Sequence, residues 1–231
     1  MMGHTVYADV APNRLRSELI FSEGHAIHER WQTWLREMGV LWGGWQCIHC
    51  DELVQDWSDN LVNTECPNGV TKHQWKYREV PLSLGRISGH ADGIVNPTSM
   101  ESFILEAKSI GPGTLRKLDV LMDDEADFSG SDKFSKITRP LGDHFRQLQI
   151  YLRLLRSTPV GDESIDAATR GIMIYEYKAD QQVREFVVTY NPHWTDELFD
   201  IAEDIEWAVD HDREIKCPYG GCFQCKIYEE Q

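Results

Sequence analysis

The spacing of apolar residues predicts three long helices. Residues Asn13 to Met38 carry apolar side chains at helical intervals, and so do Asp143 to Ser157 and Pro192 to Asp212. In the first of these segments the apolar positions are Leu15, Leu19, Ile20, Ile27, Trp31, Trp34 and Leu35. Each segment therefore has one face that favours burial.

Between these helices the pattern becomes that of β-strands. Residues His73 to Ile94 contain two expected strands, and a turn at Asn96 to Ser99 leads to a third, largely buried strand over Ser102 to Ser109. Gly171 to Tyr177 and Val183 to Tyr190 predict a further strand pair. The order of helices and strands predicts the α/β class, with a mixed central sheet flanked by helices.

Three segments have no clear period. Leu41 to Cys50 (LWGGWQCIHC) is expected to be rich in turns, and Asp51 to Asn63 is polar and ambiguous. Leu118 to Arg139 is expected to be a loop or an interrupted helix. With 231 residues, the chain is long enough for one sizeable domain, which we assign to residues 1–231.

Composition narrows the class of protein. No run of about 18 apolar residues predicts a membrane span, and the first residues lack the pattern of a secretory signal. The sequence thus predicts a cytoplasmic protein without membrane contact. The formal charge of −15 argues against a protein that coats DNA non-specifically, because phosphate neutralisation needs basic residues. Any binding of nucleic acid is expected in a local groove.

The candidate chemistry lies in two short motifs. Gly89-His90-Ala91-Asp92-Gly93 is followed after a turn by Ile104-Leu105-Glu106-Ala107-Lys108. Alternate residues of a strand share a face, so Glu106 and Lys108 point one way while Leu105 and Ala107 point the other. Asp92, on the neighbouring strand, is expected to meet the charged pair.

Two carboxylates beside an ammonium suit catalysis with Mg²⁺ or Mn²⁺. Asp92, Glu106 and the backbone carbonyl of Ala107 would be metal ligands, and Lys108 would orient a water or stabilise the transition-state anion. The simpler alternative is that Asp92-Gly93 forms a turn and that Glu106 and Lys108 form a salt bridge.

Two further motifs surround this pair. Gly24 to His28 has the form G-x-x-x-H, and Gln147 to Tyr151 has the form Q-x-x-x-Y. With four motifs in this order, the sequence resembles the PD-(D/E)XK nucleases, in particular the RecB-like branch with its CRISPR-associated and phage exonucleases. The resemblance extends from Gly24 to Tyr190.

The resemblance implies a restriction-endonuclease-like fold and a DNA nuclease. His28 would join Asp92 and Glu106 as a metal ligand, and Gln147 and Tyr151 would position the phosphate or the attacking water. His25 is the rival of His28 but does not fit the motif's spacing. The expected activity is exonucleolytic, on linear or single-stranded DNA ends, in recombination, repair or replication in a bacterium or a phage-infected cell.

The resemblance leaves the partners and two other functions open. A recombinase or helicase partner and a homo-oligomer are both compatible with it. A structure-specific endonuclease and a catalytically silent nucleic-acid-binding or assembly module are the alternative functions.

The cysteines indicate a second kind of metal site. Cys47, Cys50 and Cys66 have the spacing of zinc knuckles, and His73 is the preferred fourth ligand over His49. We therefore predict a zinc-ribbon-like insertion over residues 42–75.

The Cys-bearing tail, residues 213–231, leaves alternatives open. Its Cys217, Cys222 and Cys225 match the three late cysteines that hold a [4Fe–4S] cluster in RecB-like relatives, but this chain has no early Cys in the first helix. A cluster completed by Cys47, Cys50 or Cys66, a zinc site formed by Cys47, Cys50, Cys222 and Cys225, and free thiols in the tail all remain open.

A local basic rim is the last expectation. The candidate phosphate-binding residues flank the catalytic motifs along the chain: Arg116, Lys117, Lys133, Lys136 and Arg139. An ordinary solvated loop is the alternative.

Overall fold

The computed structural model describes residues 12–61, 65–69, 72–98, 101–118, 130–158, 160 and 162–214. Within them a seven-stranded sheet has the order β2-β1-β6-β7-β8-β9, with β3 also paired to β1. The strands are β1 (Leu41–Cys47), β2 (Leu53–Trp57), β3 (Trp75–Arg78), β6 (Gly93–Val95), β7 (Phe103–Ile110), β8 (Arg170–Tyr177) and β9 (Val183–Thr189). Strands β7 and β8 are parallel, whereas the other pairs are antiparallel. The predicted α/β class with a mixed sheet is confirmed.

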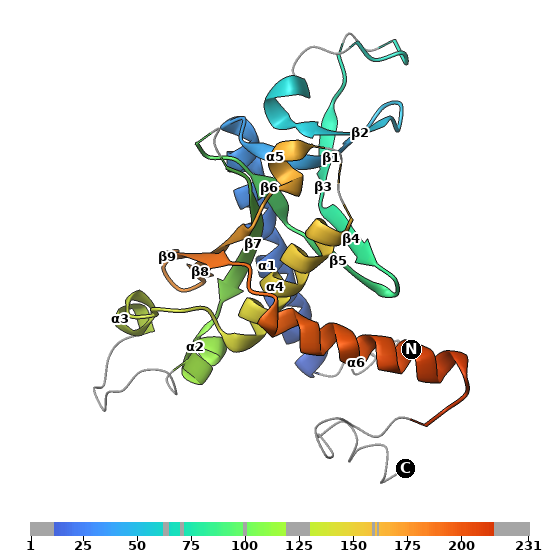
Figure 1. Cartoon of the computed structure of the whole chain (residues 1–231). Helices are drawn as coiled ribbons and strands as arrows, with labels where there is room; N and C mark the ends of the chain where they lie inside the picture. The colour runs from blue at the N-terminus through green and yellow to red at the C-terminus, as the bar shows by residue number, and fades with distance from the viewer. Residues whose placement is uncertain are drawn as a thin grey trace, which may run out of the picture.

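Two long helices cover opposite faces of this sheet, as Figure 1 shows for α1 (Pro12–Glu37) and α4 (Gly142–Ser157). The alternation of β7 explains the two layers. Phe103, Leu105 and Ala107 join the apolar cluster against α1, and Ile104 joins the cluster against α4. Glu106 and Lys108 alternate with Leu105 and Ala107, as predicted.

The remaining helices are mostly short. They are η1 (Ser58–Leu61), α2 (Pro112–Leu118), α3 (Gly130–Ser135), α5 (Glu163–Asp166) and the longer α6 (His193–Asp210). In α1 the predicted apolar face is only partly buried: Ile27 is buried, but Leu19 and Trp34 are exposed. Within the described ranges, no helix is long and apolar enough to span a membrane.

Four strands replace the two expected over His73 to Ile94. Strands β3 and β6 join the main sheet, whereas β4 (Val80–Leu84) and β5 (Ile87–Ala91) form a separate antiparallel hairpin, visible in Figure 1 beside α4. The chain leaves the main sheet at Glu79 and re-enters it after Asp92. Because Val80 pairs with Ala91, these two acidic residues come next to each other at the base of the hairpin.

Strand β1 differs from the sequence-based expectation. Leu41 to Cys47 was expected to form turns, but it is a strand that pairs with β2, β3 and β6. Six of its seven residues are buried, so no polar alternation marks it. Gly43 lies against Tyr77, whose ring carbon Cε2 would be 2.6 Å from an added Cβ. Much of the segment assigned to an insertion, 42–75, therefore belongs to the central sheet.

Candidate active site

Three side chains with metal-binding atoms meet at the base of the β4–β5 hairpin. His28 comes from α1, while Glu79 and Asp92 are the residues at which the hairpin leaves and rejoins the sheet. One potential ligand atom from each lies within 4.8 Å of the others. His28 Nδ1 is 3.1 Å from Asp92 Oδ1, and the Asp92 carboxylate raises the pKa of His28 through their hydrogen bond.

The backbone around Asp92 is held from several sides. Its Oδ2 accepts a hydrogen bond from the Ala107 amide at 2.7 Å, so β7 fixes the carboxylate. Its carbonyl oxygen accepts hydrogen bonds from the Tyr77 hydroxyl at 3.1 Å and from Gln32 Nε2 at 3.2 Å. Asp92 is only 5% exposed. One of its carboxylate oxygens is held by β7, and the other faces His28.

Glu106 lies in the same region but is held differently. Its Oε1 is 2.5 Å from Lys108 Nζ, and its Oε2 is buried without a hydrogen-bond partner. Burial, and next the charge of Asp92, raise the pKa of Glu106 to about 7, although Lys108 opposes the rise. A buried carboxylate oxygen without a donor is costly unless a cation or a proton satisfies it.

Gln147 and Tyr151 lie on one face of α4. Gln147 Nε2 donates a hydrogen bond to the Tyr151 hydroxyl at 2.8 Å. Burial raises the pKa of Tyr151, and the negative charges of Glu106 and Asp92 also contribute to the rise. The hydroxyl therefore interacts electrostatically with both carboxylates. The Tyr151 ring lies against Gly89, where an added Cβ would be 2.6 Å from ring carbon Cε1. The glycine of the GHADG motif thus makes room for the tyrosine.

His144 lies one helical turn before Gln147 and was not predicted. The Tyr175 hydroxyl accepts the Leu141 amide hydrogen at 2.9 Å and lies 2.7 Å from His144 Nδ1. The tyrosine hydroxyl can donate to Nδ1 or accept from it, depending on the tautomer of His144. Burial, followed by the charge of Lys108, lowers the pKa of His144 to about 4.

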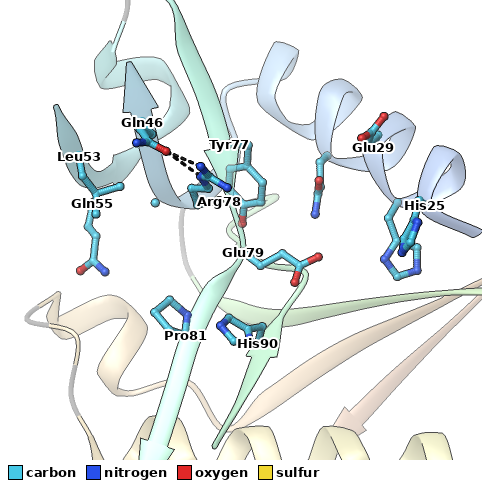
Figure 2. A pocket seen from close by; sticks show the side chains of 13 residues that line it. His25, Glu29, Gln46, Leu53, Gln55, Tyr77, Arg78, Glu79, Pro81 and His90 are labelled. Atoms are coloured by element: carbon cyan, nitrogen blue, oxygen red, sulfur yellow. Dashed lines mark hydrogen bonds between the residues drawn. The ribbon is translucent and has the colours of Figure 1, made fainter. Parts of the chain in front are cut away.

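A cleft of about 570 Å³ opens beside the hairpin base. His25, Glu79 and His90 line the end near the candidate ligands, and Gln55 and Arg78 line the far end. Figure 2 shows α1 on one side of this cleft and strands β1 and β2 on the other. Arg78 donates to Gln46 Oε1, which holds the guanidinium against the far wall.

The structure brings most of the predicted catalytic residues together. His28 contacts Asp92, Lys108 contacts Glu106, and Gln147 contacts Tyr151. One detail differs from the expectation, because the group formed by His28, Glu79 and Asp92 does not include Glu106. The Ala107 amide donates to Asp92 Oδ2, and the role of the Ala107 carbonyl as a ligand stays a prediction. The Glu106–Lys108 ion pair of the simpler alternative is present.

The sequence reasoning missed Glu79, Gln32, Tyr77 and His144. For Glu79 a signal existed. Residues 80 and 91 pair symmetrically about the turn at Gly85 and Arg86, so residue 79 must lie opposite residue 92. Gln32 and Tyr77 act on a backbone carbonyl, which no local pattern reveals.

Three of the five residues predicted to form a basic rim do not line this cleft. Among the cleft-lining residues of the described chain, Arg139, Lys133 and Lys136 are absent. Arg139 instead lines a second cavity formed with the start of α4 and with β9. The side chains of Arg116 and Lys117, in α2, lie outside the described residues.

A second group of potential ligands lies at the tip of β1 and before β3. It consists of Cys47, Cys50, Cys66 and His73, the four residues named from the sequence. His49, the weaker choice, contacts Cys47 Sγ through its amide rather than its ring. Cys217, Cys222 and Cys225 lie outside the described residues.

Comparison with known proteins adds little to this geometry. No family model matches the chain, and no curated protein matches it. A solved structure titled "Crystal structure of SSO0001" aligns with a TM-score of 0.31 and 16% sequence identity, over 78% of this chain. The chain spans 62% of the length of that protein. A likeness of this size carries no functional argument.

Proposed function

We propose that this protein is a divalent-metal-dependent deoxyribonuclease of the PD-(D/E)XK kind. The observation that carries the proposal is the meeting of His28, Glu79 and Asp92 at the hairpin base, beside the Glu106–Lys108 pair. The buried Oε2 of Glu106, which has no hydrogen-bond partner, suits a ligand for a divalent cation. Oxygen ligands with one imidazole suit Mg²⁺ or Mn²⁺.

The role of each side chain follows from its contacts. His28, Glu79 and Asp92 supply ligand atoms, and Asp92 is fixed by the Ala107 amide. Glu106 stands outside that group and would add its buried Oε2 as a further ligand. A bound divalent cation would screen the phosphate charge and make a water more acidic. Lys108 is placed to stabilise negative charge on the phosphate once Glu106 Oε1 is engaged elsewhere.

Helix α4 supplies the other polar groups of the site. The Gln147–Tyr151 pair presents an amide and a hydroxyl close to the carboxylates. In the proposed reaction they orient the scissile phosphate or the attacking water. Phosphodiester hydrolysis breaks the P–O bond to the leaving sugar, and water supplies the new oxygen and the proton of the leaving hydroxyl.

The substrate class rests on the sequence resemblance together with the cleft. The resemblance favours DNA ends as the substrate. A chain with a formal charge of −15 is expected to bind DNA in a confined groove, and the cleft beside the hairpin base is such a groove. We therefore propose exonucleolytic action on linear or single-stranded DNA, in recombination, repair or replication.

The test uses end-labelled linear duplex, single-stranded and closed circular DNA, each with Mg²⁺, with Mn²⁺ or with EDTA. Cleavage of the linear forms only with metal is expected, while circles survive. Lys108→Ala should reduce the rate by about 10²–10³-fold, as removal of a transition-state donor does. Glu106→Gln should also lower the rate, because it removes a proposed ligand charge. Its matched control is Glu203→Gln, at an exposed position of α6, which should leave the rate unchanged.

Other outcomes would change the proposal in defined ways. Cleavage of circles keeps the chemistry and assigns an endonuclease. Binding of DNA without cleavage under either metal contradicts the catalytic roles and favours a binding or assembly module.

A further inference from the structure

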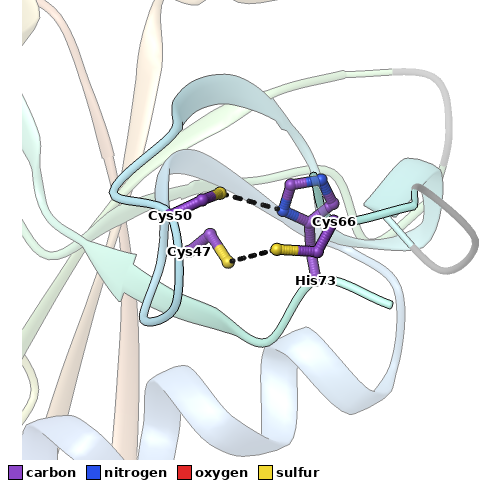
Figure 3. Close-up of side chains that lie close together, drawn as sticks. All are labelled: Cys47, Cys50, Cys66 and His73. Carbon is purple, nitrogen blue, oxygen red and sulfur yellow. Dashed lines mark hydrogen bonds between the residues drawn. The ribbon is translucent and has the colours of Figure 1, made fainter. Parts of the chain in front are cut away.

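Four sulfur and nitrogen side chains converge beyond the far end of the cleft. Cys47 ends β1, Cys50 lies in the turn after it, Cys66 follows η1, and His73 precedes β3. Figure 3 shows the four side chains directed at a common centre. One ligand atom from each lies within 4.8 Å of all the others.

The distances match those of a tetrahedral zinc site. Zinc–sulfur bonds of about 2.3 Å imply about 3.8 Å between two thiolates, and about 3.6 Å between a thiolate and an imidazole nitrogen. Cys47 Sγ and Cys66 Sγ are 4.0 Å apart, and Cys50 Sγ is 3.6 Å from His73 Nδ1. A disulfide would need about 2.05 Å between its sulfurs, so the Cys47–Cys66 approach is not one.

The environment of His73 selects the nitrogen that faces the thiols. Its Nε2 is 3.3 Å from Glu52 Oε2, which leaves Nδ1 to face Cys50. Metal-binding histidines commonly give their other nitrogen to a carboxylate in this way. The ring also stacks on Trp75, with centroids 4.5 Å apart and an interplanar angle of 14°. Contacts with Glu52 and Trp75 thus orient the imidazole.

Backbone hydrogen bonds hold the turn between Cys47 and Cys50 in a tight conformation. The His49 amide points at Cys47 Sγ at 3.4 Å, and the Cys47 amide donates to the Glu52 carbonyl at 2.8 Å. Asp51 adopts a φ of 59°, which lets the chain reverse tightly. Asn68 Nδ2 donates to the His49 carbonyl at 2.5 Å, which ties the Cys66 loop to this turn.

We propose that Cys47, Cys50, Cys66 and His73 bind one structural Zn²⁺. Four protein ligands fill a tetrahedral shell and leave no position for water or substrate, as in structural rather than catalytic zinc sites. Cys47 is fully buried and Cys66 is 6% exposed, so the ion would be enclosed. Thiolates make the site unsuited to Mg²⁺, which distinguishes it from the oxygen-rich group at the hairpin base.

The position of this site gives it a structural task. Strands β1, β2 and β3 carry Gln46, Gln55 and Arg78, which line the far end of the cleft. The zinc site joins the end of β1 to the start of β3 across the connecting loops. We expect loss of zinc to increase hydrogen exchange in β2 and β3 while β7 and β8 stay protected.

The test is the metal content of the full-length protein by mass spectrometry, after purification and washing with EDTA. One zinc per chain is expected, and cobalt substitution should give the visible bands of a tetrahedral ion together with thiolate charge transfer. His73→Ala should lower zinc affinity by at least about 100-fold in competition with a chromophoric chelator, and Glu52→Gln by about 10-fold.

Three control variants distinguish loss of a zinc ligand from misfolding and from other sets of ligands. His73→Cys keeps four ligands and should keep one zinc. Cys222→Ser and Asp92→Asn should keep it as well, because neither residue belongs to the proposed set. Absence of zinc and of cobalt bands in the wild type, iron in place of zinc, or zinc loss in Cys222→Ser would each overturn the proposal. None of these readouts depends on nuclease activity.

Discussion

The two groups of potential metal ligands in the described part of the chain differ in both composition and exposure. The cysteine–histidine group is rich in sulfur, enclosed, and supported by Glu52 and Trp75. The group at the hairpin base is rich in oxygen and borders a cleft, and the nearby Glu106 has a buried carboxylate oxygen without a hydrogen-bond partner. A closed shell stabilises the fold, whereas an open one leaves room for a phosphate. The contrast agrees with the two proposals, in which the first group joins strands and the second binds the catalytic cation.

The largest expected difference between the two groups is their response to chelation. EDTA should remove the cation from the open group and lower DNA cleavage to background, and added Mg²⁺ should restore it fully. Zinc content, measured on the same samples, should not change. Parallel loss of zinc and activity that Mg²⁺ cannot reverse would show that the groups are not independent.

Glu79 provides the next test, because the sequence motifs did not include it. Glu79→Gln removes one charge from the open group and should lower the cleavage rate by about 10–100-fold, with a higher Mg²⁺ requirement. Rates at several Mg²⁺ concentrations measure this. Glu65→Gln, an exposed position near the cysteines, is the control and should behave as wild type. Wild-type Mg²⁺ dependence in Glu79→Gln would exclude the residue from the site.

Stability should change in opposite directions at the two groups. In EDTA, Glu106→Gln removes a buried charge that lies close to Asp92, so the melting temperature should rise by a few degrees. His73→Ala should lower it by on the order of 5 °C, because the joined strands lose their metal. Differential scanning calorimetry gives both values. A fall in Glu106→Gln would mean that the Lys108 ion pair outweighs the cost of burial.

His144 offers the smallest and most local test. Its pKa is about 4 in the folded protein and 6.5 ordinarily, owing to burial and then to Lys108. The unfolded chain therefore binds a proton more readily, and stability should fall as the pH drops from about 6.5 to about 4. The loss at pH 5 is on the order of 1 kcal/mol after allowance for solvent screening.

His144→Gln is the variant for that test, since its side-chain amide does not titrate and can either donate to the Tyr175 hydroxyl or accept from it. It should show a smaller fall in free energy of unfolding between pH 7.5 and pH 5, measured by urea titration. His193→Gln, in α6, serves as the histidine control. An equal fall in all three proteins would contradict the neutral His144.

The sequence predicted the parts of the fold that carry a clear period. The strand with Glu106 and Lys108 and the helix with Gln147 and Tyr151 were recognised, because alternation and helical spacing are local properties. Strand β1 was not predicted, because it is buried on both faces and therefore lacks the alternation of apolar and polar residues that indicates a strand. The hairpin was read as a continuation of its neighbours, because nothing in the local pattern shows where a chain changes sheets.

The candidate site was predictable to the same extent. Four short motifs named His28, Asp92, the Glu106–Lys108 pair and the Gln147–Tyr151 pair. Cysteine spacing named the three thiols of the second group, with His73 as the preferred fourth ligand. Glu79 required knowledge of which strand residues pair, and Gln32 and Tyr77 required the position of a backbone carbonyl. Such contacts between distant segments are not encoded by local spacing.

The symmetric pairing of the hairpin has a consequence for how this protein tolerates change. Glu79 and Asp92 are placed by the Val80–Ala91 pair at the base, not by the turn near Gly85. Residues added at the turn lengthen the arm and leave both carboxylates where they are. A single residue inserted within either strand shifts the register and turns one carboxylate to the opposite face. The turn can therefore change in length without moving the two carboxylates, whereas neither strand at the base can gain or lose a residue. Arg86 at the tip also contacts Glu206 and Asp210 of α6, so its own identity is tied to that helix.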